Sequence, residues 1–178
     1  MLEFIKRHSY DVVKMFINQL AISIFGFSLA FATGESQPAL FIGTSAFSIL
    51  FYLFLIYVMM WDLGAKDCRR LERNLPGYTR LAGLYMALLA SVPNLILALL
   101  ITLGTLIPSL SGMAAVGNFL VLVLEGMYDG LLTATVNGVK VGSIWAIYYA
   151  LPIPLVLTST LAYFAGSKEF KIFGNKSK

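Results

Sequence analysis

The sequence predicts an all-α integral membrane protein, with four transmembrane helices and one further helix that lies at the outer interface or re-enters the bilayer without crossing it. Its composition is the first reason: 58% of the 178 residues are hydrophobic and only 12% are charged. Soluble domains average about 45–50% hydrophobic and about 25% charged residues, so a soluble fold of this composition would lack the polar residues to cover its surface. Long apolar runs, rather than alternating residues, predict helices and not a barrel.

The spacing of the charges is the second reason, because a charge at the bilayer centre costs about 2.5–3.5 kcal/mol. A helix needs about 20 apolar residues to cross the hydrocarbon. Charge-free intervals occupy residues 15–34, 36–61, 81–124 and 141–167. The third interval is too long for one span and breaks at Pro108 and Gly112. We therefore predict a single membrane domain with spans over residues 13–33, 39–61, 81–107 and 142–166.

The segment over residues 113–134 is predicted as the interfacial or re-entrant helix. On a continuous helix Asn118, Glu125 and Asp129 would share one face. Carrying both carboxylates across the bilayer would cost about 5–7 kcal/mol. We expect Glu125 and Asp129 to form an acidic pair on a solvated outer face, where they could act together on a cation or a proton. The alternative is a fifth span, in which residues 113–137 cross.

The basic residues predict the orientation, because cytoplasmic segments are enriched in lysine and arginine. With both termini cytoplasmic, Lys140 is the one lysine or arginine that lies outside. The cytoplasmic side then holds the N-terminus, the loop over residues 62–80 and the tail over residues 167–178. The basic residues on that side are Lys6, Arg7, Lys14, Lys66, Arg69, Arg70, Arg73, Arg80, Lys168, Lys171, Lys176 and Lys178. A fifth span would export the lysines of the tail. This distribution predicts a multi-pass protein of the cell (plasma) membrane. A signal-peptidase site after Ala32 is the alternative start, disfavoured by Glu3 and Asp11 before it.

Small and polar side chains form stripes on two of the predicted spans. They predict close helix packing, and the stripes consist of Gln19, Ser23, Gly26 and Ala30 in the first span and Gly83, Ala87, Ser91, Asn94 and Ala98 in the third. A second interpretation is a polar intramembrane site formed by Gln19 and Asn94, since Pro93 frees a backbone carbonyl beside Asn94. Pro152 and Pro154 should kink or unwind the last span.

The loop over residues 62–80 is predicted to continue the second helix, with Asp62 and Lys66 one turn apart. Its arginines are candidate contacts for anionic lipid headgroups or for a protein partner: Arg69, Arg70, Arg73 and Arg80. The net charge of +4 is concentrated beside apolar segments. This placement indicates orientation and contact with headgroups, and it argues against nucleic-acid binding.

The sequence offers little catalytic chemistry. Cys68 is the single cysteine and His8 the single histidine, which excludes an internal disulfide, a Cys-x-x-Cys pair and a multi-cysteine metal site. We predict no cofactor, no metal and no enzymatic activity. The leading hypothesis is a non-enzymatic subunit or accessory component of a membrane complex, with self-association or a protein partner. The alternatives are a small oligomeric transporter or channel, and a lipid-modifying enzyme with Asp62 or Asp67 in a pocket.

Overall fold

The fold is all-α. The computed structural model describes residues 2–33, 38–72, 79 and 81–168. Its α-helices are α1 (Leu2–Thr33), α2 (Pro38–Glu72), α3 (Ala82–Ala90), α4 (Val92–Leu106), α5 (Ser111–Leu124), α6 (Asp129–Thr133) and α7 (Ile153–Ser167). Short 3₁₀ turns and one two-residue hairpin complete the described chain: η1 (Pro108–Leu110), η2 (Gly126–Tyr128), β1 (Thr135–Val136), β2 (Val139–Lys140), η3 (Val141–Ser143) and η4 (Trp145–Tyr149).

Three described helices are long and apolar enough to cross a membrane: Phe4–Thr33, Ala39–Arg70 and Trp145–Ser167. Two pairs of consecutive helices pass the same test when each pair is taken as one bent span, which raises the number of candidate spans to as many as five. The pairs are Ala82–Ala90 with Val92–Leu106, bent by 46°, and Pro108–Leu124 with Gly126–Leu132, bent by 88°. The predicted spans over residues 13–33 and 39–61 lie within the first two of the three unbroken helices, and the predicted span over residues 142–166 overlaps the third. The predicted span over residues 81–107 is the pair with the smaller bend.

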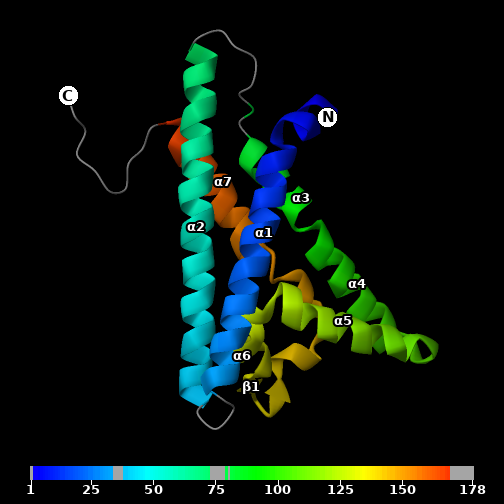
Figure 1. The fold of residues 1–178 in the computed structure, drawn as a ribbon. Coiled ribbons are helices and arrows are strands. Elements are labelled where there is room, and N and C mark those ends of the chain that lie inside the picture. The colour runs from blue at the N-terminus through cyan, green and yellow to red at the C-terminus, as the bar shows by residue number, and fades with distance from the viewer. Residues whose placement is uncertain (1, 34–37, 73–78, 80, 169–178) are drawn as a thin grey trace.

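The two ends of the molecule differ in charge. Figure 1 shows the start of α1, the end of α2, the start of α3 and the end of α7 at one end, which we call the basic end. The end of α1, the start of α2 and the hairpin lie at the opposite end. The helices at the basic end carry Lys6, Arg7, Lys66, Arg69 and Arg70, and Lys168 follows the end of α7, while Lys140 belongs to the hairpin.

Glycines allow α2 and α7 to pack at very short range. A Cβ atom added at Gly166 would lie 2.0 Å from the carbonyl oxygen of Trp61, and one added at Gly64 would lie 2.2 Å from that of Tyr163. Small residues in this position let two membrane helices bring their backbones together. The crossing is surrounded by fully buried side chains of both helices, including Met60 and Tyr163.

The predicted stripes are buried, as expected for packing faces. Gln19, Ser23 and Ala30 are all at most 3% exposed. The second stripe continues across the bend between α3 and α4, and its members Gly83, Ala87, Ser91, Asn94 and Ala98 are buried. A Cβ atom at Gly83 would lie 2.7 Å from the carbonyl oxygen of Ser159 on α7. Both stripes are therefore used for packing inside this chain.

The prolines mark helix starts. Pro93 lies in the first turn of α4, and the 46° bend separates α4 from α3. Pro152 precedes α7 and Pro154 lies in its first turn, after the 3₁₀ turn η4. A missing N–H costs little in a first turn, because that group has no partner within the helix. The predicted break near Pro152 and Pro154 is confirmed, because the chain changes there from the 3₁₀ turn η4 to the α-helix α7.

The prediction of one continuous helix over residues 113–134 is wrong. The α5 helix ends at Leu124, and the chain turns by 88° before α6. Glu125, Asn118 and Asp129 therefore do not share a helical face. In Figure 1, α5 and α6 lie in the half of the molecule away from the basic end.

Candidate functional site

The sharp turn after α5 brings Glu125 into the protein interior. Glu125 is 1% exposed and separates α5 from η2. The expectation of a solvated outer face is therefore wrong for this residue. In a continuous helix the N–H of Tyr128 would donate to the carbonyl oxygen of Leu124. Here it donates to the carbonyl oxygen of Glu125 at 2.8 Å, so the carbonyl of Leu124 loses its usual helical donor. A carbonyl left without a partner in this way must be satisfied by another group.

Side chains of α1 supply that partner. Gln19 donates through Nε2 to the carbonyl oxygen of Leu124 at 3.0 Å, and the Ser23 hydroxyl donates to the same oxygen at 2.7 Å. The approach requires glycine on both sides: a Cβ atom at Gly26 would lie 2.7 Å from Met127 Cα, and one at Gly126 would lie 2.8 Å from the carbonyl oxygen of Ser23. Two residues of the α1 stripe, Gln19 and Ser23, thus cap the C-terminal end of α5.

We call Gln19, Ser23, Tyr52, Leu124 and Glu125 the Glu125 junction. Three of its oxygen atoms are buried without a hydrogen-bond partner: Gln19 Oε1, the Tyr52 hydroxyl and Glu125 Oε2. The Tyr52 and Tyr128 hydroxyls both lie within electrostatic range of the Glu125 carboxylate. Tyr128 itself donates to the carbonyl oxygen of Leu151 at 3.1 Å. Unsatisfied buried oxygens are uncommon in native proteins, so the junction is the first candidate site.

A cleft beside this region, which we call the Asp129 cleft, is lined by residues of α5, α6 and η4, including Val121, whose carbonyl accepts from the N–H of Glu125. It has a volume of about 450 Å³ and is lined by Asn118, Val121, Asp129, Lys140 and Tyr148 among others. The Tyr148 hydroxyl donates to the carbonyl oxygen of Gly142 at 2.9 Å. Tyr148 lines the cleft and lies within electrostatic range of both Glu125 and Asp129.

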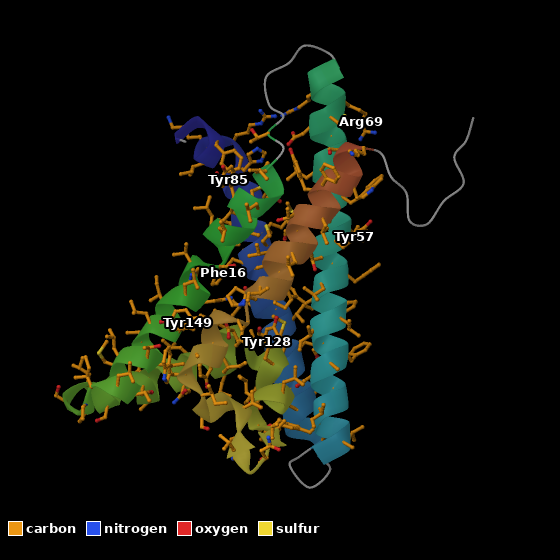
Figure 2. All side chains as sticks on the ribbon, turned by 180° about the vertical axis from the view of Figure 1, so that it is seen from behind. Phe16, Tyr57, Arg69, Tyr85, Tyr128 and Tyr149 are labelled. Carbon is orange, nitrogen blue, oxygen red and sulfur yellow. The ribbon has the colours of Figure 1, made fainter. Side chains whose placement is uncertain are left out.

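The second candidate site is a cleft at the basic end, which we call the basic cleft. It has a volume of about 540 Å³ and is lined by Arg7, His8 and Asp11 of α1 and by Leu63, Lys66, Asp67, Arg69 and Arg70 of α2. Arg69 and Arg70 are exposed. Figure 2 shows Arg69 near the end of α2, with Tyr57 on the same helix between the levels of Arg69 and Tyr128. The predicted contact residues Arg73 and Arg80 lie outside the described residues.

A partly buried ion pair joins two walls of the basic cleft. Asp67 is 2% exposed, and it accepts from Arg7 Nη2 at 3.3 Å and from the Tyr163 hydroxyl at 2.9 Å. This cluster ties α1, α2 and α7 together. The predicted pair of Asp62 and Lys66 on α2 is confirmed as an exposed ion pair. His8 lies against the Phe4 ring, and its Nδ1 is 3.5 Å from an oxygen of Asp11.

The predicted intramembrane pair is not brought together by any described contact. Asn94 is 4% exposed and its Oδ1 has no partner, whereas Gln19 belongs to the Glu125 junction. Neither residue lines the Asp129 cleft or the basic cleft. Sequence reasoning missed Tyr52, because a single tyrosine in an apolar run resembles an ordinary core residue. The sequence feature that pointed to the junction was the spacing of Gln19, Ser23 and Gly26 on the first span.

Comparisons with known proteins identify no relative. No protein-family model matches the chain, and neither a curated protein nor a solved structure matches it. Among the described residues, no group of three or more His, Cys, Asp or Glu side chains could hold a metal ion. The assignment of a function therefore depends on the two candidate sites.

Proposed function

We propose that this chain is a non-enzymatic component of a membrane assembly, with both termini on the cytoplasmic side of the plasma membrane, and that its basic cleft binds anionic lipid headgroups. The several apolar helices make it a helical protein suited to a bilayer. The basic cleft is the observation that carries the proposal. Arg7, Lys66, Arg69 and Arg70 line it, and Asp67 is already occupied by Arg7 and Tyr163.

The position of this charge supports binding at a membrane surface. The basic cleft lies where α1 begins and α2 ends, on two of the helices that are long enough to cross. Each lysine or arginine near an anionic surface contributes about 1 kcal/mol to lipid binding. Arginine also binds phosphate oxygens through two parallel N–H bonds. Phosphate-bearing headgroups are thus the ligand class that the cleft suits best.

Substitution of the two exposed arginines tests the lipid contact. Arg69→Gln with Arg70→Gln should raise the apparent Kd for phosphatidylglycerol about 30-fold, since two cationic contacts of about 1 kcal/mol each are lost. Native mass spectrometry of protein from nanodiscs with phosphatidylglycerol and phosphatidylcholine measures this affinity through lipid retention. Lys140→Gln, in the hairpin, is the matched control and should retain lipid as the wild type does. Equal loss in both variants would contradict a specific cleft.

Native mass spectrometry of the protein purified from its own membrane tests for an assembly. A stoichiometric protein partner copurified from the native membrane would support the accessory role. A homo-oligomer alone would favour the second candidate function, a small transporter or channel. That alternative has a specific observation behind it: the buried and unpartnered oxygens of Gln19 and Asn94.

Catalysis on lipids at the basic end has weaker support. Asp62 is paired with Lys66, and Asp67 accepts from Arg7 and Tyr163. Carboxylates held in such pairs stabilise structure and are poorly placed to bind a metal or activate water. We therefore propose no enzymatic step.

A further inference from the structure

Glu125 is buried where an ionised carboxylate is costly. Its side chain is among the fully buried ones, and Oε2 has no hydrogen-bond partner. The ion pairs of the described residues join Arg7 to Asp67, His8 to Asp11 and Lys66 to Asp62, so no described cation is paired with Glu125. A buried carboxylate without a cation costs several kcal/mol, and a proton on the carboxyl group removes that cost.

The elements around Glu125 supply oxygens but no positive charge. From α1 come Gln19 and Ser23, and from α2 comes Tyr52. The titratable groups that face Glu125 are Tyr128 of η2, Tyr52 of α2 and Tyr148 of η4, while Asp129 begins α6. The α4 helix, which packs on α5, contains no titratable residue. Asp129 and Lys140 are charged groups that line the Asp129 cleft.

Unpartnered atoms show that the junction is built to receive a hydrogen. A protonated carboxyl group has one O–H donor, and Gln19 Oε1 is an acceptor without a donor. The Tyr52 hydroxyl is a donor without an acceptor, and the remaining carboxyl oxygen accepts. A single water with these groups as partners could bridge them. Gln19 of α1, Tyr52 of α2 and Glu125 in the α5–η2 turn thus each contribute one buried, unpartnered oxygen to the junction.

We propose that Glu125 is a proton-binding site within the membrane domain, which holds a proton on its buried carboxyl group and exchanges it with water in the Asp129 cleft. In the exchange, the O–H bond at Glu125 breaks and its electron pair stays on the carboxylate. The proton forms a new O–H bond on a water molecule of the cleft, and it returns by the reverse step. Ionisable groups inside membrane proteins commonly mark proton or ion pathways. The inference is independent of lipid binding at the basic cleft.

Infrared difference spectroscopy of the full chain in lipid films tests the proposal. The wild type at neutral pH should show the carbonyl-stretch band of a protonated carboxyl group, and the near-isosteric variant Glu125→Gln should lack it. The band should shift when the film is equilibrated in D₂O, because the proton exchanges. Its intensity should fall about tenfold per pH unit once the pH is well above the midpoint of its titration. Absence of the band from the wild type, or a band that does not shift in D₂O, would overturn the proposal.

Two tyrosine variants keep the test independent of whether Glu125→Gln folds. Tyr52→Phe removes the hydroxyl that faces Glu125, whereas Tyr57→Phe removes an unpartnered buried hydroxyl elsewhere on α2. The carboxyl band should change position in Tyr52→Phe and stay in place in Tyr57→Phe. The same change in both, or in neither, would contradict the assignment of the band to the junction.

A comparison of salts separates a proton from a metal ion. The band should be the same in sodium chloride and in choline chloride at equal concentration, as expected when a proton neutralises Glu125. Loss of the band in sodium chloride alone would overturn the proposal and assign the junction to an alkali cation.

Discussion

Gly166→Val should lower the free energy of unfolding by about 3 kcal/mol, with a fall in Tm of about 10 °C. The reason is the close crossing of α2 and α7: a Cβ atom at this position would lie 2.0 Å from the carbonyl oxygen of Trp61 and 2.8 Å from its carbonyl carbon. Both atoms belong to the backbone of α2, so no side-chain rotation relieves the clash. The two helices must separate, and the buried side chains around the crossing lose their contacts.

Gly43 of α2 provides the matched control, because a Cβ atom there meets nothing within 4 Å. Thermal unfolding of both variants in the same detergent, followed by size-exclusion chromatography of the remaining folded protein, measures the difference. Gly43→Val should unfold within a few degrees of the wild type. If Gly166→Val were as stable as Gly43→Val, α2 and α7 could not cross at this distance.

Arg7→Met should also be strongly destabilising, by about 3 kcal/mol. The substitution keeps most of the apolar stem but removes the cation 3.3 Å from Asp67, whose side chain is only 3% exposed. Asp67 then keeps its hydrogen bond from Tyr163 but loses the cation beside it. A buried charge without its counter-ion costs more than the lost contact alone.

The neighbouring substitution Lys6→Met is the control, because Lys6 is exposed on the same helix. Thermal unfolding should show a fall in Tm for Arg7→Met and little change for Lys6→Met. Adding Asp67→Asn to Arg7→Met should recover part of the loss, since the uncompensated charge is then removed. Failure of the second substitution to restore any stability would show that the ion pair is not the cause.

The apolar helices were predictable because they depend on composition along the chain. A long interval without charges favours hydrocarbon or the core, and each of the helices over Phe4–Thr33, Ala39–Arg70 and Trp145–Ser167 contains most of one such interval. The ion pair of Asp62 and Lys66 was also predictable, because residues four apart are neighbours on any helix. These features depend on local sequence alone.

The break at Glu125 could not be predicted from periodicity. The continuous face of Asn118, Glu125 and Asp129 assumes one unbroken helix, yet the helix ends because α1 supplies Gln19 and Ser23 as partners for the Leu124 carbonyl. These residues are separated from Leu124 by 105 and 101 positions in the sequence. A turn that tertiary contacts stabilise has no local signature beyond Gly126, which permits the close approach to Ser23.

The ion pair in the basic cleft was missed for the same reason. The sequence places Arg7 and Asp67 on different helices, 60 positions apart, and gives no sign that they meet. Conversely, Gln19 and Asn94 were correctly marked as polar residues in apolar surroundings. Their grouping into one site did not follow, because each is buried against a different set of neighbours.

The proposed topology requires that the chain enters the bilayer after α4, turns at Glu125 and leaves on the same side. Two exposed positions flank this segment, Ser109 in η1 and Thr135 in β1. Cysteines at each position, in a Cys68→Ser background, can be labelled with a membrane-impermeant maleimide in intact cells and in inverted vesicles. With four spans and a re-entrant segment, both cysteines should react in intact cells. Reaction of position 109 in cells and of position 135 only in inverted vesicles would show that the segment crosses, and would contradict this account.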